Sequence, residues 1–209
     1  MPENNSSEKI SAIQFNQQFW ENRYTLGETG WDLGEVSPPL KAYFDQLTNK
    51  DLRILIPGCG NTYEAEYLLN KGFKNITVVD ISPTLIENLK TKFGHHPNLK
   101  ILLGDFFALE GEFDLIVEQT FFCALDRSLR QSYSDKMFSL LSNSGKLVGL
   151  LFNREFEAEG PPFGGCEEDY RELFSTKFNI TTMANSYNSF SKRAGTELFT
   201  IFKKKNLAE

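Results

Sequence analysis

Short runs of apolar and β-branched residues alternate along the chain with segments in which apolar residues recur every three or four positions. Such runs are typical of buried strands, and the three- and four-residue spacing is typical of helices packed on them. Strands are predicted at 54–56, 76–80, 99–103, 113–118, 147–152, 178–187 and 197–204. Helices are predicted at 13–24, 40–47, 63–70, 84–93, 127–141 and 167–174.

This alternation predicts an α/β fold with a mostly parallel, doubly wound, Rossmann-like sheet, right-handed crossovers and a C-terminal antiparallel strand pair. Ligands of such sheets bind outside the carboxyl ends of the strands. The chain of 209 residues shows no repeat and fits one domain, which we place at 13–209. Residues 13–50 are expected to form a helical N-terminal lid, and residues 1–12 are expected to be disordered.

Composition narrows the classes of partner. The formal net charge of −6 argues against a nucleic-acid binder, which usually presents a basic face, but not against a small-molecule or anionic substrate. Cys59, Cys123 and Cys166 form no metal-ligand or redox pattern, so we expect no metal, and reduced thiols in a cytoplasmic protein. No apolar run approaches the roughly 20 residues that cross a membrane. We expect a monomer or a weak homodimer.

The turn after the first strand has the composition of a nucleotide-binding loop. Gly58, Cys59 and Gly60 follow the strand directly, and Asp80 closes the next strand 20 residues beyond Gly60. A carboxylate at that place accepts hydrogen bonds from ribose hydroxyls. Position 63 is Tyr where a dinucleotide fold has its third glycine, and Glu64 at the helix start repels a diphosphate. The pattern favours S-adenosylmethionine over NAD; a turn that merely needs glycine is the alternative.

Two further loops follow strands at the same edge. Asp105 and Phe106 come after the third strand, where they can bind the adenine amine and ring, or else cap a helix and fill the core. Glu118, Gln119 and Phe122 come at the end of the fourth strand, and we expect them to face the reaction centre. Either Phe122 or its neighbour Phe121 is expected to be a core residue instead.

At the N-terminal side, aromatic residues precede and occupy a glycine-containing loop. Trp20 and Tyr24 lie four positions apart on the first predicted helix, and Trp31 lies in the loop that follows. Because loops run over the surface, Trp31 is a poor candidate for the core. A lid or pocket wall and simple packing both account for this pattern.

The chain resembles the thiopurine S-methyltransferase superfamily, and within it the halide, thiol and thiocyanate methyltransferases of plants and bacteria. The resemblance spans the chain from about Trp20 to its last strand. The matching stretches are Gly27-x-Thr29-x-Trp31-Asp32, Ile56-Pro57-Gly58-Cys59-Gly60, Val79-Asp80-Ile81-Ser82, Asp105-Phe106-Phe107, Phe113-Asp114-Leu115-Ile116, Phe121-Phe122-Cys123-Ala124, Gly160-Pro161-Pro162-Phe163 and Arg193-x-Gly195-x-Glu197.

The resemblance implies a class I methyltransferase fold with S-adenosylmethionine as the methyl donor. The residues that it assigns to the donor are Trp31, Gly58, Asp80, Ile81, Asp105 and Phe106. Cys59 and Gly60 of the glycine turn are expected to join them, as is Glu118, whose carboxylate at the end of the fourth strand can attract the sulfonium. The residues expected near the acceptor are Trp20, Tyr24, Gln119, Phe122 and Arg193. Position 119 is Arg in the thiopurine enzymes and Gln here, which argues against a thiopurine as the natural substrate.

The expected reaction is an in-line displacement at the sulfonium methyl, which depends on orientation more than on acid or base. Halide, bisulfide, thiocyanate and thiolate acceptors already carry the attacking electron pair, so we expect no catalytic triad. A neutral thiol needs a base, for which Glu118 is the nearest candidate. Three alternatives stay open: a thiopurine-type methyltransferase, an NAD-dependent oxidoreductase on a Rossmann sheet, and a non-catalytic relative that binds S-adenosylmethionine.

Overall fold

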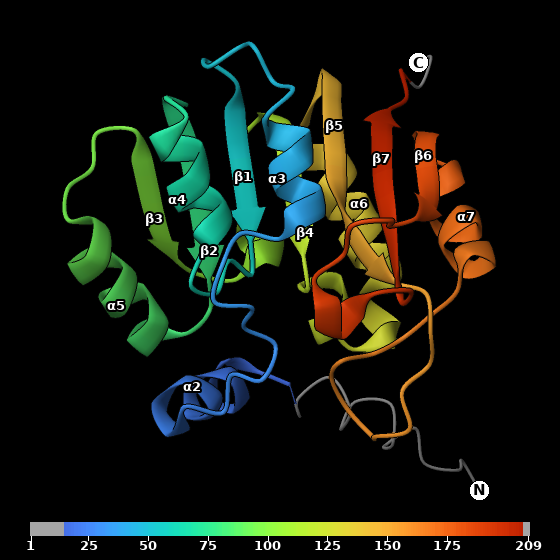
Figure 1. Cartoon of the computed structure of the whole chain (residues 1–209), viewed down its shortest axis with the longest axis horizontal. Coiled ribbons are helices and arrows are strands. Elements are labelled where there is room, and N and C mark those ends of the chain that lie inside the picture. The colour runs from blue at the N-terminus through green and yellow to red at the C-terminus, as the bar shows by residue number, and fades with distance from the viewer. Residues whose placement is uncertain (1–14, 207–209) are drawn as a thin grey trace, which may run out of the picture.

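Residues 15–206, which the computed structural model describes, contain one seven-stranded sheet of order β3-β2-β1-β4-β5-β7-β6 (Figure 1). β1 to β5 are parallel, and β7 runs antiparallel to both of its neighbours, β5 and β6. The strands are β1 Arg53–Pro57, β2 Asn75–Asp80, β3 Leu99–Leu103, β4 Phe113–Gln119, β5 Leu141–Phe152, β6 Phe178–Asn185 and β7 Glu197–Lys204.

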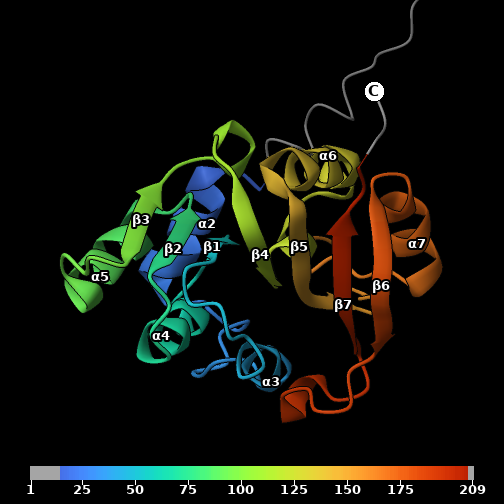
Figure 2. The ribbon, with the colours of Figure 1, turned by 90° about the horizontal axis from the view of Figure 1, so that it is seen from above.

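Helices cover both faces of the sheet. α3, α4 and α5 lie on one face, and α6 and α7 lie on the other (Figure 2). The helices are α2 Gln17–Leu26, α3 Pro38–Phe44, α4 Tyr63–Asn70, α5 Pro83–Phe93, α6 Arg130–Leu140 and α7 Glu167–Ser175. Short 3₁₀ turns are η1 Phe106–Ala108, η2 Phe122–Ala124, η3 Arg127–Leu129 and η4 Ser191–Arg193.

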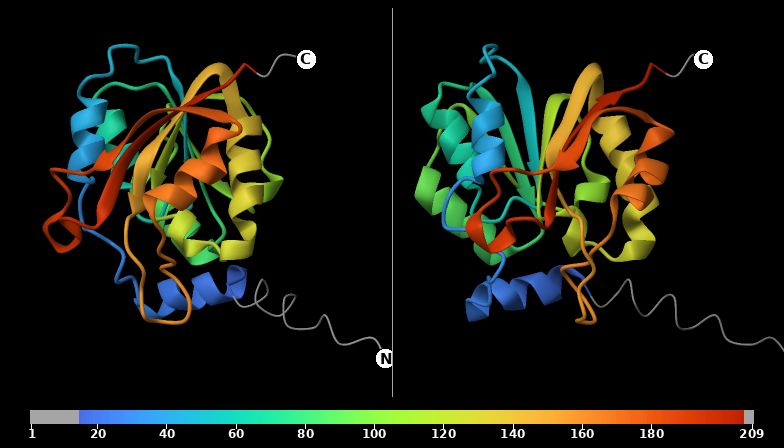
Figure 3. Two further views of the ribbon diagram at one scale, coloured as in Figure 1. Left: turned by 90° about the vertical axis from the view of Figure 1, so that its right-hand side faces the viewer. Right: turned by 45° about the vertical axis from the view of Figure 1, so that its right-hand side comes forward.

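α2 covers neither face. It lies across the end of the molecule toward which the arrowheads of β1 and β5 point (Figure 1). The segment 153–166 after β5 extends to the same end and lies beside α2 in both views of Figure 3. The ring centroids of Phe15 and Phe163 are 5.5 Å apart and join the two segments. The carboxyl ends of the parallel strands are therefore covered by two segments that lie far apart in the sequence.

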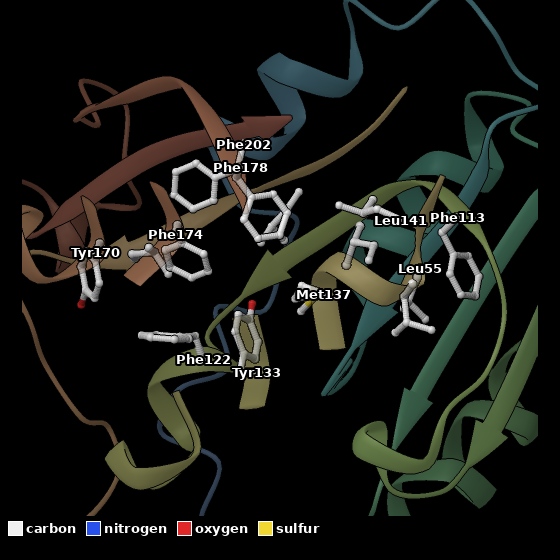
Figure 4. Close-up of a cluster of buried hydrophobic side chains, with 14 of the residues drawn as sticks. Leu55, Phe113, Phe122, Tyr133, Met137, Leu141, Tyr170, Phe174, Phe178 and Phe202 are labelled. Atoms are coloured by element: carbon white, nitrogen blue, oxygen red, sulfur yellow. The ribbon is translucent and has the colours of Figure 1, made fainter. Parts of the chain in front are cut away.

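Each face of the sheet has its own core. On the α3–α5 face, Phe44, Leu68 and Leu89 are buried against the apolar residues of β1 and β2. On the α6–α7 face, rings dominate: Tyr133, Tyr170, Phe174, Phe178 and Phe202 lie in one buried cluster (Figure 4). Two cores separated by a strand layer are what strands apolar on both faces predict.

The predicted fold class is confirmed, including the antiparallel C-terminal pair. Several boundaries differ from the prediction: α2 covers Gln17–Leu26 and not 13–24, α3 covers Pro38–Phe44 and not 40–47, and β6 ends at Asn185 and not at 187. Two further differences concern β5 and α6. β5 begins at Leu141 and not at 147, because Leu141 pairs with Phe113 across a register shift in the β4–β5 ladder. The predicted helix 127–141 is divided into η3 and α6. The expectation of disorder at 1–12 lies outside the described residues, and within 15–206 no helix has the length and apolar character to span a membrane.

Candidate functional site

A cavity of about 460 Å³ opens at the carboxyl ends of the parallel strands, beneath α2. Its volume lies within the range of small-molecule sites. The turns after β1, β2, β3 and β4 form its floor, and α2 with the loop that follows forms its roof. Of the predicted site residues, those that line it are Trp20, Tyr24, Trp31, Gly58, Cys59, Gly60, Asp80, Ile81, Asp105, Phe106, Gln119 and Arg193.

The turn after β1 requires its glycines. Gly58 and Gly60 adopt φ values of 54° and 50°, a region that side chains rarely enter. A Cβ on Gly58 would also lie 2.1 Å from Cδ2 of Phe121, so the absence of a side chain admits that ring against the turn. Cys59 donates its backbone N–H to the oxygen of Val79 at 3.2 Å, which ties the turn to the end of β2.

Asp80 joins the ends of β1 and β2. Its Oδ2 accepts the N–H of Gly60 at 3.3 Å, and its Oδ1 accepts the N–H of Ser82 at 3.1 Å. The side chain is 8% exposed, and this burial raises the pKa of the carboxyl above its ordinary value. The two hydrogen bonds fix the carboxylate at the cavity wall, as the 20-residue spacing from Gly60 predicts.

The first turn of α4 also carries a buried acid. Glu64 accepts the N–H of Ser37 at 3.1 Å, and burial raises the pKa of its carboxyl. The acid therefore ties the N-terminus of α4 to the segment that leads into α3. It occupies the helix end where a dinucleotide fold binds its diphosphate.

Aromatic side chains form the roof. Trp31 meets Trp20 and Tyr24 edge-on, with ring centroids 5.5 and 5.7 Å apart. Burial raises the pKa of the Tyr24 phenol, with the Asp80 carboxylate as the next cause, so the hydroxyl is neutral at physiological pH. The predicted lid residues thus form one continuous apolar wall.

α2 is attached to the turn between β2 and α5. The Glu21 carboxylate accepts the Ser82 hydroxyl at 2.6 Å, the Thr84 N–H at 3.1 Å and the Thr84 hydroxyl. These hydrogen bonds lower the pKa of Glu21, Ser82 having the largest effect. Gln17 adds a hydrogen bond to the oxygen of Ile81 at 2.9 Å. The segment that carries Asp80 and Ile81 is therefore also the segment that holds the roof.

The loop after β3 combines features of both predicted roles, which were binding of adenine and, alternatively, helix capping with core packing. Asp105 Oδ1 accepts the N–H of Phe107 at 2.9 Å and begins η1, while the residue itself stays exposed at the cavity. Phe106 is 4% exposed, and its ring centroid lies 5.1 Å from that of Phe121. Phe106 is thus a core residue whose ring reaches the cavity wall.

The expectation that Glu118 and Phe122 face the reaction centre is wrong. Neither side chain lines the cavity. Glu118 is 2% exposed, and burial raises the pKa of its carboxyl to about 7. Phe122 packs beside Tyr133 inside the core, with ring centroids 4.9 Å apart (Figure 4). Phe121 lines the cavity in its place.

Gln119 and Arg193 reach the cavity from different elements. The Gln119 Oε1 atom is buried and has no hydrogen-bond partner in the protein. Arg193 donates from Nη2 to the oxygen of Trp31 at 2.7 Å and from Nη1 to Oε1 of Glu197 at 3.3 Å. The Gln119 amide oxygen therefore has no partner, whereas the Arg193 guanidinium is already hydrogen-bonded, and both residues border the same cavity.

Sequence reasoning missed several lining residues. Asp32 accepts hydrogen bonds from the Asn61 amide and, at 3.3 Å, from the Tyr63 hydroxyl, so it closes the cavity over the start of α4. Phe152 lines the wall from the end of β5. Its place could have been predicted, because it ends a parallel strand at the same edge. Among residues 15–206, no cluster of three acids, histidines or cysteines could hold a metal ion.

Comparisons with known proteins agree with this geometry. A model of the family described as Thiopurine S-methyltransferase (TPMT) matches residues 15–206. Probable thiol methyltransferase 2 of Arabidopsis thaliana is 31% identical over 191 residues, covering 88% of this chain and 84% of that protein. Thiopurine S-methyltransferase of Acinetobacter baylyi is 27% identical over 203 residues, covering 85% of this chain and 92% of that protein.

Among solved structures, the fold matches that of 1,6-didemethyltoxoflavin-N1-methyltransferase of Burkholderia thailandensis, with bound 1,6-didemethyltoxoflavin and S-adenosylhomocysteine. The TM-score is 0.73 at 18% identity, and the match covers 99% of this chain and 93% of that one.

Proposed function

The chain belongs to the thiopurine S-methyltransferase family and is an S-adenosylmethionine-dependent methyltransferase, and on this premise we propose that its acceptor is a small, soft nucleophile: a halide, bisulfide, thiocyanate or a thiol. The family assignment replaces the NAD-dependent alternative. A monomeric or weakly dimeric state stays a prediction, which sedimentation velocity tests.

The residues of the cavity fit the methyl donor. When bound, S-adenosylmethionine supplies a methyl group on a positively charged sulfonium sulfur. Asp80 offers a fixed carboxylate to the ribose hydroxyls, and Asp105 and Phe106 offer an acceptor and a ring face to the adenine. The Gln119 Oε1 atom, buried and unpartnered, is an acceptor that a ligand completes. Trp31 adds an electron-rich ring that favours a cation.

The observation that supports the acceptor class is that the acids on the floor of the cavity are held by backbone N–H groups; Glu28, Asp32 and Glu35 also line the cavity, from the loop after α2. Of the residues described at the cavity, none is a histidine, and Asp80, Glu64 and Asp105 each accept a backbone N–H. Burial raises the pKa of the Tyr24 phenol and of the Cys59 thiol, so neither is ionised at neutral pH. An acceptor that already carries its electron pair needs no such base.

The protein's contribution is then orientation and desolvation. Two reactants held in line gain several kcal/mol from proximity alone. The rings of Trp20, Trp31 and Phe121 exclude water from the wall. A large, weakly hydrated anion loses less on entering such a pocket than a small, strongly hydrated one. This ordering favours iodide and sulfur anions over chloride and oxygen nucleophiles.

An aromatic thiol of the thiopurine type is the second candidate. The ring-lined roof favours a planar acceptor, and the Acinetobacter baylyi relative bears the thiopurine name. Against it, Gln119 supplies a neutral amide at the cavity where a cationic side chain would attract the thiolate form.

The test is a product assay. The purified chain is incubated with S-adenosylmethionine and, separately, with iodide, bisulfide, thiocyanate, a small thiol and a thiopurine. Volatile methyl products are measured in the headspace and the thiopurine product by chromatography. We expect turnover with the soft anions to exceed that with the thiopurine by at least tenfold in kcat/KM. A thiopurine preference would overturn the proposal, as would the absence of all products from a protein that binds S-adenosylhomocysteine.

A further inference from the structure

We propose that Glu118 is a positioning residue that, together with Tyr133, holds segment 119–123 in the backbone arrangement that seats Phe121 against the glycine turn, and thereby sets the affinity for the methyl donor. The proposal depends on donor binding, which the family establishes, and is independent of the acceptor.

The segment after β4 contains a strained residue. Thr120 adopts a φ of 59°, a left-handed conformation that is unfavourable for a β-branched residue. Such conformations persist only where the surrounding contacts fix them. The Glu118 Oε1 atom accepts the N–H groups of Phe121 and Phe122, at 2.8 and 2.9 Å. One carboxylate oxygen therefore closes the turn over Thr120 and fixes the two residues that follow.

Tyr133 fixes the other oxygen of the same carboxylate. Its hydroxyl donates to Oε2 of Glu118 at 2.6 Å, and its side chain is fully buried. Its ring centroid lies 5.9 Å from that of Phe106 and 6.0 Å from that of Phe121, both of which line the cavity. Figure 4 shows Tyr133 beside Phe122 in the core. Tyr133 therefore supports the donor wall with its ring and the turn with its hydroxyl.

Two glycines make room for this arrangement. Gly149 on β5 lies opposite Glu118, and a Cβ there would come within 2.3 Å of the Glu118 Cβ. On the other side, the Phe121 ring occupies the space that a Cβ of Gly58 would need. A continuous set of contacts thus runs from Tyr133 through Glu118 and Phe121 to the donor turn.

The surroundings of Glu118 argue against the alternative role of base. Glu118 does not line the cavity, and its two oxygens already accept three hydrogen bonds. The titratable groups that face it are Tyr133 on α6 and Cys123 on η2, and burial raises the pKa of both, so neither is charged at neutral pH. Oε1 can accept the two N–H groups whether the carboxyl is ionised or protonated. Its task is therefore geometric.

The experiment compares Glu118→Gln with Glu118→Ala. The amide keeps an oxygen for the two N–H groups, whereas alanine leaves them and the Tyr133 hydroxyl unpaired. We expect the dissociation constant for S-adenosylhomocysteine, measured by calorimetry, to change less than threefold in E118Q and to rise at least tenfold in E118A. The matched control is Asp114→Asn on the same strand, whose carboxylate binds Arg53 and Ser142 at the opposite end; it should lower thermal stability and leave the dissociation constant unchanged.

A double-mutant cycle separates positioning from general destabilisation. If Glu118 acts through Phe121, E118A adds little to the loss of affinity in Phe121→Ala, and the combined effect is clearly less than the product of the two. Independent, multiplicative effects would overturn the proposal. So would an E118Q variant that binds S-adenosylhomocysteine normally and yet loses most of its kcat, because the carboxylate charge would then be required.

Tyr133→Phe keeps the proposal testable should E118A fail to fold. This change removes one hydroxyl and leaves both backbone hydrogen bonds to Oε1. We expect a three- to tenfold rise in the dissociation constant for S-adenosylhomocysteine, with the acceptor KM unchanged. An unaltered dissociation constant in a folded Y133F protein would contradict the role assigned to the pair.

Discussion

The guanidinium of Arg193 donates a hydrogen bond of 2.7 Å to the main-chain oxygen of Trp31, across 162 residues of sequence. The same guanidinium lies 3.3 Å from the carboxylate of Glu197, and both side chains are buried. The turn η4 between β6 and β7 therefore holds the roof of the cavity at Trp31, and Glu21 holds it at Ser82.

We expect Arg193→Ala to lower the free energy of unfolding by about 3–5 kcal/mol, because it leaves Glu197 buried without its cation. It should also weaken donor binding, since the backbone of Trp31 loses its attachment. Urea unfolding and calorimetry with S-adenosylhomocysteine measure the two effects.

Lys192→Ala is the matched control for Arg193→Ala, because this neighbouring side chain is exposed. It should leave stability and affinity unchanged. The double variant Arg193→Ala/Glu197→Gln should recover part of the lost stability, since it removes the unpaired charge. Equal stability of the single and double variants would contradict the ion-pair explanation.

Trp31→Ala should discriminate between the donor and its product. A sulfonium placed by an aromatic face gains about 0.5–2 kcal/mol, equivalent to a roughly 2- to 30-fold change in affinity. S-adenosylhomocysteine lacks the charge, so its affinity should fall by less. The ratio of the two dissociation constants, wild type against variant, measures the cation contribution. An equal loss for both ligands would show that Trp31 acts by shape alone.

The hydrogen bonds that attach α2 to the turn between β2 and α5 should weaken at low pH. Hydrogen bonds lower the folded pKa of Glu21 below its ordinary value of 4.5. A group with a lowered pKa stabilises the fold fully above its unfolded pKa, and that contribution is lost as the pH falls through the folded value. We therefore expect α2 to lose hydrogen-exchange protection, after correction for intrinsic rates, only below pH 4.5.

Glu21→Gln tests the same attachment at constant pH. Charge-assisted hydrogen bonds are stronger than neutral ones. We expect the loss of this difference in strength to lower the hydrogen-exchange protection of α2 by about tenfold. The variant should also remove the acid dependence below pH 4.5. A wild-type profile that persists in the variant would assign the acid response to another group.

The acceptor should determine how the rate depends on pH. Iodide is fully ionised at every pH, so its kcat/KM should stay flat between pH 6 and pH 8. A thiol with a pKa near 8.5 should show a rise of about tenfold per pH unit below that value. An inflection near pH 7 with iodide that disappears in E118Q would show that ionisation of Glu118 affects the reaction.

Much of the fold could be predicted from the sequence, because most strands coincide with short runs of apolar and β-branched residues. The runs at 76–80 and 99–103 differ from β2 and β3 by at most one residue. The start of β5 was not predicted from the sequence, because Ser142, Asn143, Ser144 and Gly145 are turn-forming residues. They enter the strand because the adjacent end of β4 pairs with Leu141, a contact that local pattern cannot reveal.

The candidate site was likewise predictable only in part. Asp80 and the glycine turn are identified by spacing, since geometry leaves little choice for a carboxylate at the end of the second strand. The direction of Glu118 was not predictable. It depends on a partner, Tyr133, that lies 15 residues away on α6. The left-handed Thr120 also breaks the two-residue alternation, so that Phe121 and Phe122 exchange the places expected of them.

β7 lies between β5 and β6, although it follows both in the chain. The sheet therefore cannot close in the order of synthesis: β5 waits for its antiparallel neighbour until residues 197–204 have left the ribosome. Until then β5 and β6 present unpaired edges, the kind of surface on which nascent chains aggregate. A ribosome stalled before Glu197 would display the donor-binding half of the sheet without the strand that covers the edge of β5.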